Sequence, residues 1–166
     1  MAEIDDVVDV ELVNEAQYQI EIAAETDFSN PVALTEIQAI INRVNNSEAA
    51  IVAILESSSS VGGGISSEPL SSDVLTAITG LTSVITENVA AYNALIEAET
   101  DFSNPPSLVE IQSIIDEANT SVIVLAEVLE DSASEGGANN VNGSAVRAEQ
   151  LALISCLLYT SDAADE

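Results

Sequence analysis

The chain repeats part of its own sequence at an offset of 74 residues, and this repeat restricts its possible folds more than any other feature. The string ETDFSNP stands at 25–31 and again at 99–105, and segments 18–45 and 92–119 agree at 17 of 28 positions. Self-similarity at a fixed period is the signature of proteins built from repeated structural units. We therefore expect two copies of one unit.

Each copy contains a long stretch whose apolar residues recur at steps of three and four positions, which is the spacing of one face of an α-helix. In the second copy these residues are Leu108, Ile111, Ile115, Ala118, Val122, Leu125 and Leu129. In the first copy they are Leu34, Ile37, Ile41, Val44, Ile51 and Leu55, with a polar interruption at Glu48 that the neighbouring Ala49 can replace. The pattern predicts one long helix in each copy.

Two shorter helices are expected between these long ones. One runs over about Leu81–Glu99 and carries apolar residues along one side. The other covers Asp73–Thr79, with Ser71 or Ser72 as its N-cap and Gly80 as its stop.

These elements predict an all-α fold of two tandem helical repeat modules. Each module has about three helices, antiparallel to one another, and one long loop rich in Ser, Gly and Asn, at 57–64 and 132–143. The modules are expected at 1–80 and 81–155, the second of them truncated. Modules of this size bury little core, so we expect each to pack against neighbouring repeats of the same chain.

The repeat carries the same side chains at equivalent places in both copies. They are Tyr18, Phe28, Asn30, Pro31, Glu36 and Gln38 in the first copy and Tyr92, Phe102, Asn104, Pro105, Glu110 and Gln112 in the second. The asparagine before each proline is predicted to be a helix N-cap, with the proline at the first helical position. The glutamate lies near the same helix start, where the helix dipole favours an acid.

Three further expectations concern these recurring residues. Each phenylalanine is interpreted as a plug that buries the loop between two helices, with an exposed recognition aromatic as the alternative. Each glutamine is expected to bond the backbone of a neighbouring loop rather than a ligand. In the second copy, Ser107 and Glu110 also have the spacing of a capping box.

Composition excludes most catalytic chemistry. The chain has 29 acidic and two basic residues, no lysine, no histidine and a formal net charge of −27. Nucleophile–histidine pairs, imidazole metal sites and Schiff-base or phosphate-binding lysines are therefore excluded. We expect no enzyme activity, no nucleic-acid partner and no membrane insertion, since phosphates would be repelled and the apolar runs are short. Because 47% of the residues are hydrophobic, a core can still form.

No cofactor is expected, and calcium is the one alternative. The stretch 138–149 places Asn140, Asn142 and Glu149 at the third, fifth and twelfth positions of an EF-hand loop, with a glycine at the sixth. Its first position is Ala138, where that loop needs an aspartate, and the first copy does not keep the pattern. The sequence therefore predicts no metal site and leaves Asn140, Asn142 and Glu149 as the remaining calcium candidates.

The last eleven residues resemble something other than a natural protein segment. Residues 156–166 read CLLYTSDAADE, which resembles the in-frame translation of a transposase adapter used in sequencing libraries. We therefore treat them as a non-native tail outside the fold. This treatment removes the only cysteine and three of the 29 acidic residues.

Three strings carry a family resemblance: NVAAY at 88–92, ETDFSNPPSLVEIQSIIDEAN at 99–119 and LEDSASEGG at 129–137. They resemble the tandem helical repeats of very large bacterial surface or adhesin-like proteins, and of phage tail-fibre-like proteins. The resemblance covers nearly all of 12–155. It implies an extracellular or cell-surface spacer, stalk or interaction module within a larger secreted polypeptide, whose other domains bind the surface ligand.

Two other interpretations stay open. One is a calcium-responsive binding module whose loops order on the ion. The other is an intracellular acidic protein of a halophile, because a strongly acidic chain without lysine suits salty surroundings. The N-terminus has no signal-peptide pattern, which fits the expectation that the chain is a fragment of a longer protein.

Overall fold

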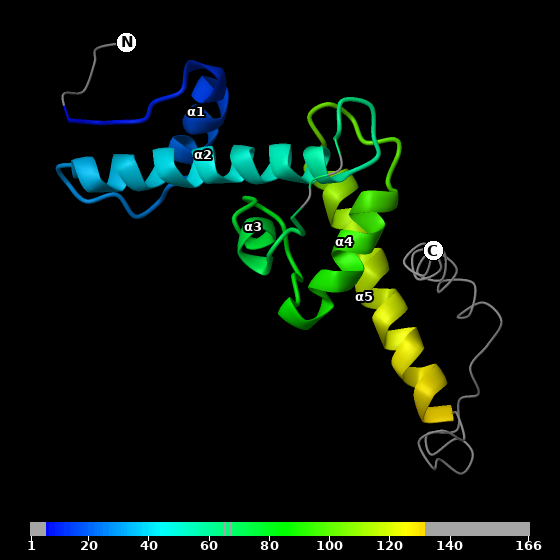
Figure 1. Cartoon of the computed structure of the whole chain (residues 1–166). Coiled ribbons are helices and arrows are strands. Elements are labelled where there is room, and N and C mark those ends of the chain that lie inside the picture. Colours follow the sequence, from blue (N-terminus) through cyan, green and yellow to red (C-terminus); the bar gives the residue numbers. More distant parts are fainter. Residues whose placement is uncertain (1–5, 65, 67, 132–166) are drawn as a thin grey trace.

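The structure is a computed structural model, and it describes residues 6–64, 66 and 68–131. These residues form helices and connecting loops, without a strand among them (Figure 1). The elements are the 3₁₀ helix η1 (Leu12–Asn14), α1 (Glu15–Ala24), α2 (Leu34–Ser57), α3 (Ser72–Thr76), the 3₁₀ helix η2 (Thr86–Asn88), α4 (Val89–Ala98) and α5 (Leu108–Asp131). The predicted all-α class is confirmed for this part of the chain. The bounds of η2, α4 and α5 each lie 74 residues after those of η1, α1 and α2.

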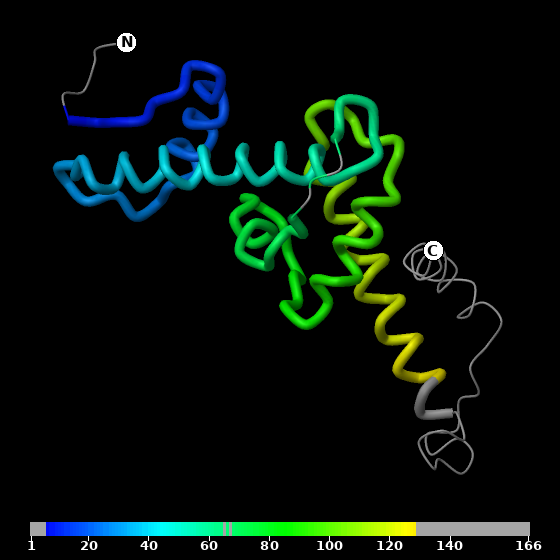
Figure 2. The backbone as a smooth tube through the Cα atoms, viewed as in Figure 1, coloured from blue at the N-terminus to red at the C-terminus, as the bar shows by residue number. Residues whose placement is uncertain are grey.

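The helices pack as two pairs joined by a short helix. Contacts join α1 to α2 and α4 to α5, and α2 also contacts α4. The backbone path shows α3 in the angle between α2 and α4, while α5 extends beyond the length of α4 (Figure 2). The partners in each pair run in opposite directions: Tyr18 bonds Asn45, and Glu21, one turn later in α1, bonds Arg43, which comes earlier in α2.

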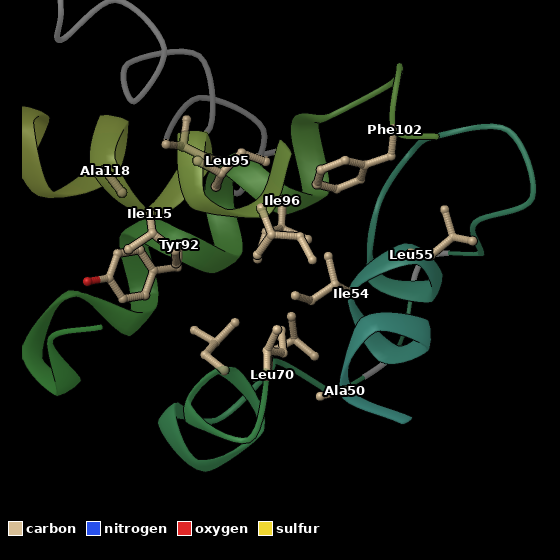
Figure 3. Close-up of a cluster of buried hydrophobic side chains, with 14 residues drawn as sticks. Ala50, Ile54, Leu55, Leu70, Tyr92, Leu95, Ile96, Phe102, Ile115 and Ala118 are labelled. Carbon is tan, nitrogen blue, oxygen red and sulfur yellow. The ribbon is translucent and has the colours of Figure 1, made fainter. Parts of the chain in front are cut away.

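Buried apolar side chains form two clusters of unequal size. The smaller cluster contains Tyr18 from α1 and Ile40, Ile41 and Val44 from α2. The larger cluster draws on α2, α3, α4, α5 and the loops beside them; its members are Ala50, Ile54, Leu55, Leu70, Leu75, Ile78, Tyr92, Leu95, Ile96, Phe102, Ile111, Ile114, Ile115 and Ala118 (Figure 3). The second half of α2 therefore packs with the helices that follow it in the chain and not with α1.

Three of the predicted helices are confirmed. The apolar stretches beginning at Leu34 and Leu108 form α2 and α5, each 24 residues long. The short helix is α3, and Ser71 is its N-cap, because its side-chain oxygen accepts a hydrogen bond from the Val74 N–H. Gly80 follows at a φ of +87°, a conformation that costs little without a Cβ atom.

The helix predicted over Leu81–Glu99 is wrong in its first half, since α4 begins only at Val89. The backbone groups of this segment form hydrogen bonds with side chains that are distant in sequence. Gln112 bonds both the N–H and the carbonyl of Thr82, and Asn119 donates to the carbonyl of Ser83. Ser83 itself has a φ of +60°, which no α-helix contains.

The predicted apolar face of α5 is buried only from Ile111 to Ala118, and its first member, Leu108, is 38% exposed. Beyond Ala118 the buried residues are Ser121 and Val124, whereas Leu125 is 40% exposed. The reason is length: α4 has ten residues and lies along only part of the 24-residue α5. In α2 the apolar face is interrupted at Glu48, where the sequence predicts that Ala49 turns inward. This prediction is wrong, because Ala50 is buried and Ala49 is exposed.

We predict that Ile54→Ala destabilises the whole larger cluster. Ile54 has no exposed surface, so truncation leaves a cavity and lowers the free energy of unfolding by about 2–5 kcal/mol. Val52→Ala on the 48% exposed side of the same helix is the control and costs less than about 0.5 kcal/mol. Urea unfolding followed by circular dichroism measures both. Equal effects of the two substitutions would contradict the assigned core.

Candidate functional site

A glutamate closes each ETDFSNP loop. The carboxylate of Glu110 accepts hydrogen bonds from the N–H groups of Ser103 (2.8 Å) and Ser107 (2.7 Å) and from both of their hydroxyls (2.5 and 2.6 Å). The Glu110 N–H in turn donates to the Ser107 hydroxyl at 3.3 Å, so the predicted capping box is present. In the first copy Glu36 bonds Ser29 and the Ala33 N–H in the same way.

The predicted role of Asn30 and Asn104 as N-caps is wrong. The helices begin at Leu34 and Leu108, and the N-cap of α2 is Ala33. Both peptide bonds that join these asparagines to Pro31 and Pro105 are cis, and the prolines lie in the loop outside the helices. The glutamate three residues after the cap position supplies the acceptor that the sequence had assigned to the asparagine.

These hydrogen bonds change the acidity of the two glutamates. The hydroxyls of Ser103 and Ser107 and their backbone N–H groups lower the pKa of Glu110 from its usual 4.5 to about 2. The Ser29 hydroxyl, followed by the N–H groups of Ala33 and Ser29, lowers the pKa of Glu36 as well. In both loops the charged form is the one that the hydrogen bonds favour.

A tyrosine and two asparagines form a second recurring network. In the second copy the Tyr92 hydroxyl donates to Asn119 Oδ1 at 2.6 Å, and Asn88 donates to the same oxygen at 2.8 Å. The Tyr92 oxygen also accepts from the Ile85 N–H at 2.9 Å. In the first copy Tyr18, Asn14, Asn45 and the Glu11 N–H make the same bonds.

The asparagines of this network were not singled out from the sequence. Their signal was nevertheless present, since Asn14 and Asn88, like Asn45 and Asn119, are separated by the repeat offset. Asn88 is buried, and a buried amide needs a hydrogen-bond partner. An asparagine that recurs in step with a tyrosine therefore indicates a buried polar pair.

The recurring glutamines bond loop backbone, which is the kind of partner the sequence predicts for them. Gln38 accepts from the Val8 N–H (2.9 Å) and donates to the Val8 carbonyl (3.1 Å). Gln112 bonds the backbone of Thr82 in the same two-sided manner. Each glutamine thereby fastens the segment before the first helix of a pair to the second helix.

The loop after α2 is bonded to the second ETDFSNP loop. The Ser60 hydroxyl accepts from the Phe102 N–H and donates to the Glu99 carbonyl, both at 3.0 Å. Ser59 donates to the Glu97 carbonyl at 2.7 Å. Next to these loops, Ile54 and Ile96 point toward one another in the larger apolar cluster (Figure 3).

We name this region the α2–α4 junction. One side of the junction is the end of α2 with the loop 58–63, and the other side is α4 with the loop 99–104. At the contact Gly62 has a φ of +89°, a conformation that favours glycine, and a Cβ atom there would lie 2.9 Å from Asn104 Nδ2. Phe102 is buried here, whereas Phe28 in the first loop is half-buried against the smaller cluster.

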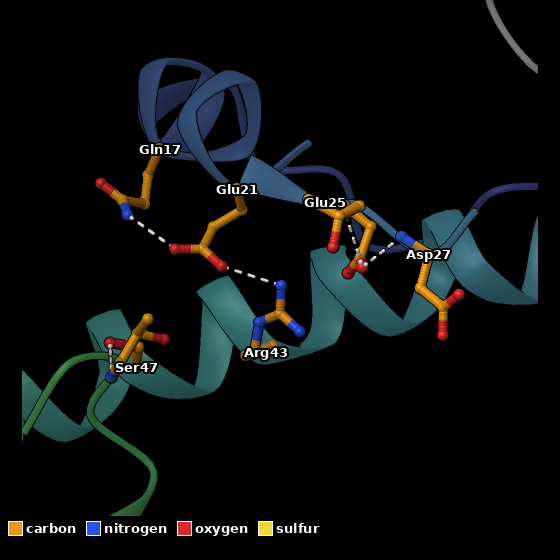
Figure 4. Close-up of polar contacts among 8 residues, drawn as sticks. Gln17, Glu21, Glu25, Asp27, Arg43 and Ser47 are labelled. Carbon is orange, nitrogen blue, oxygen red and sulfur yellow. Dashed lines mark hydrogen bonds and ion pairs between the residues drawn. The ribbon is translucent and has the colours of Figure 1, made fainter. Parts of the chain in front are cut away.

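Some polar contacts belong to one copy only. Arg43 Nη2 lies 2.8 Å from Glu21 Oε2, and Gln17 donates to the other oxygen of Glu21 (Figure 4). The equivalent positions in the second copy are Leu95 and Glu117, so this ion pair has no counterpart there. One turn after Arg43 in α2, Ser47 accepts a hydrogen bond from the Thr79 N–H.

The described residues show neither a cluster of metal ligands nor a membrane-spanning helix. Among the described residues no three His, Cys, Asp or Glu side chains are grouped closely enough to hold a metal ion. The calcium candidates Asn140, Asn142 and Glu149 lie outside the described residues. Within the described part of the chain, no helix is long and apolar enough to cross a membrane.

Comparison with protein families, curated proteins and solved structures finds no match to this chain. The recurring tyrosines, glutamines and glutamates bond backbone groups or other side chains of the chain, which positions loops and joins helices.

We predict that Tyr92→Phe and Asn119→Ala each lower the free energy of unfolding by about 1–3 kcal/mol, because each leaves buried polar groups without a partner. The double variant costs less than the sum of the two, since both remove the same hydrogen bond. Urea unfolding of the four proteins gives the coupling. Strict additivity would show that the bond contributes nothing.

We predict that Glu110→Gln destabilises the protein more at pH 7 than near pH 2. The folded-state pKa of Glu110 is lowered, so its charged form stabilises the fold above pH 4.5, and that contribution is lost as the pH falls toward 2. Glu117→Gln, on the exposed surface of α5, makes the same charge change and is the control. Thermal unfolding across this pH range measures both. A gap between the two variants that stays constant with pH would contradict the carboxylate's role.

Proposed function

We propose that this chain is a structural spacer: two copies of a helical unit from a tandem array in a large secreted bacterial surface protein of adhesin-like type. In this proposal the chain has no catalytic role, and ligand binding belongs to other domains. The observation that carries it is the α2–α4 junction, where the end of one copy packs into the start of the next.

The junction supports an array because it joins consecutive copies through both apolar and polar contacts. Ile54 and Leu55 share a cluster with Ile96 and Phe102 of the following copy. Ser60 adds two hydrogen bonds to the backbone of that copy. A rigid contact between neighbours is what lets a chain of small modules act as a stalk rather than as beads on a string.

The recurring residues support a scaffold rather than a binding site. The tyrosine–asparagine network, the glutamine bonds and the glutamate in each loop all satisfy backbone or buried polar groups. Repetition of these residues therefore maintains the shape of the unit. The sequence contains neither histidine nor lysine, so its serines have no imidazole or amine base to activate them.

The charge supports a protein that must stay extended and soluble. With a net charge of −27 over 166 residues, neighbouring copies repel one another except where a specific contact holds them. At a salt concentration of about 0.1 M the Debye length is about 10 Å, so this repulsion acts only between surfaces that come close together. It therefore keeps copies apart without weakening contacts within each copy. The family resemblance of the repeated strings favours the bacterial surface over the cytosol of a halophile.

We predict that a further copy of residues 81–155, inserted after Ser155, raises the free energy of unfolding and unfolds in the same transition as the rest. Each added copy contributes one more junction, and neighbouring contacts stabilise repeat arrays cooperatively. The control is the same extended chain with Val128→Asp, which places a carboxylate at the position equivalent to Ile54. Calorimetry measures both chains. The Val128→Asp chain should lose this gain, and an added copy that melts separately in the chain that keeps Val128 would contradict the proposal.

A further inference from the structure

The side of η1 and α1 that faces away from α2 is apolar along its whole length. Tyr18 and Asn14 face α2 and bond it, and a helix with about 3.6 residues per turn places six other side chains on the opposite side. We call these six the α1 stripe: Leu12, Val13, Ala16, Ile20, Ala23 and Ala24. All six are exposed, with Leu12 and Val13 each at 85% and Ile20 at 58%, so the described chain leaves this apolar side uncovered.

The equivalent side of α4 carries charges. The repeat offset places Glu87 where the α1 stripe has Val13, and Glu97 where it has Ala23. Both glutamates are exposed, as expected for a helix side in contact with water. A contiguous apolar patch on an otherwise charged surface marks an interaction site. The absence of both carboxylates from α1 therefore indicates that its outward side binds a partner that the side of α4 does not.

Uncharged glutamines separate the α1 stripe from the nearest acids. On one side of the stripe, Gln19 donates a hydrogen bond to Glu15 at 3.4 Å. On the other side, Gln17 donates to Glu21 at 3.5 Å, and Arg43 of α2 holds the other oxygen of that carboxylate. The charge distribution therefore fits a partner surface that is itself uncharged, because the stripe offers no charge for a basic or acidic partner to pair with.

Large and small side chains follow one another along the α1 stripe in an order that fits a second copy of the same stripe. Packing two α1 helices antiparallel, with the level of Tyr18 at the centre, brings stripe residues together in three kinds of pair. These pairs are Leu12 with Ala24, Val13 with Ala23, and Ile20 with Ala16. Each pair joins one large and one small side chain, which lets two helix surfaces interdigitate without voids. A parallel arrangement would instead place each large side chain against its own copy.

We propose that the α1 stripe binds the α1 stripe of a second copy of this chain in antiparallel orientation, so that two chains form a symmetric dimer. Both copies contribute the same surface, so the contact closes after two molecules. A second α1 can reach the stripe, because α2 lies behind α1 and both α4 and α5 lie away from it (Figure 1). This dimer does not depend on the spacer function; within an array it would join two stalks side by side.

Area and charge both limit the strength of the dimer. Covering the six side chains on both copies removes on the order of 1,000 Å² of accessible surface, which is near the lower limit for a specific interface. The net charge of −27 on each chain opposes the contact, and salt screens this repulsion. We therefore expect association at high protein concentration that strengthens as salt is added.

Sedimentation equilibrium of the full chain in about 1 M NaCl, where charges are screened within about 3 Å, tests the dimer. We expect the mean mass to rise with concentration from one chain to two and no further. Ile20→Asp weakens association by about 100-fold or more, because both copies then bury an unpaired carboxylate. Val109→Asp makes the same change at a 79% exposed position of α5, so this matched control associates like the unmodified chain.

Both variants change exposed side chains and are expected to keep their helices, which circular dichroism checks. Val13→Glu is a second variant against the dimer, and it introduces the residue that the folded second copy carries at Glu87. It also weakens association.

Exchanging the large and small side chains tests the antiparallel order. Ala16→Ile alone places two isoleucines in one pair, which keeps the helices apart and weakens association about 10-fold or more. The double variant Ala16→Ile with Ile20→Ala again pairs one large and one small side chain, so it recovers the affinity of the unmodified chain. Unspecific adhesion of apolar surface would have the opposite result, since Ala16→Ile adds apolar surface and would then associate more strongly.

Four results would overturn the proposal. They are an unmodified chain that stays a single molecule at every concentration, growth past a dimer, association that Ile20→Asp leaves unchanged, and stronger association of Ala16→Ile. None of them bears on the array, which is tested separately by the melting of a chain with an added copy.

Discussion

The burial of Ile54 and its neighbours between two helical pairs is the contact on which the rest of the structure depends. The first pair alone buries little: the smaller cluster has four members, one of them aromatic. The larger cluster gains its size by taking the end of α2, α3 and the start of α5 together. Small helical units commonly lack enough core to fold alone and need a staple or a neighbour. In this chain the second copy supplies the additional core that the end of α2 packs into, and this shared core couples the two copies.

Polar side chains then fix the shape that the apolar cluster stabilises. Tyr92 and Asn119 hold the extended segment before α4, and Glu110 holds the loop between α4 and α5. Each satisfies backbone groups that a helix or sheet would otherwise pair, so these segments are ordered without regular secondary structure. The result is a unit whose loops are fixed by side-chain hydrogen bonds as well as by packing. That property suits a spacer, whose length and direction have to be reproducible from copy to copy.

The sequence predicts the elements that are determined by neighbouring residues, and it misses those that are determined by contacts with residues far along the chain. The steps of three and four residues locate α2 and α5, and Ser71 and Gly80 bracket α3, because helix periodicity and capping act within one turn. The segment 81–85 was assigned to a helix, since its backbone partners stand 30 or more residues later in the chain. The N-cap assignment failed for a similar reason: local preference favours asparagine before proline, but the glutamate's carboxylate takes the loop N–H groups instead. Among the candidate residues, the repeat identified Tyr92, Glu110 and Gln112, whereas their partners Asn119, Ser103 and Thr82 emerged only from the structure.

The central claim is that the two copies form one cooperative unit through the α2–α4 junction. Native-state hydrogen exchange, followed by mass spectrometry at increasing denaturant below the unfolding transition, measures this most directly. The account predicts that amides in the second half of α2, in α4 and in the first half of α5 are exposed by the same opening, with the same free energy and denaturant dependence. Opening of all of α2 at a distinctly lower free energy, while α4 and α5 stay protected, would contradict it.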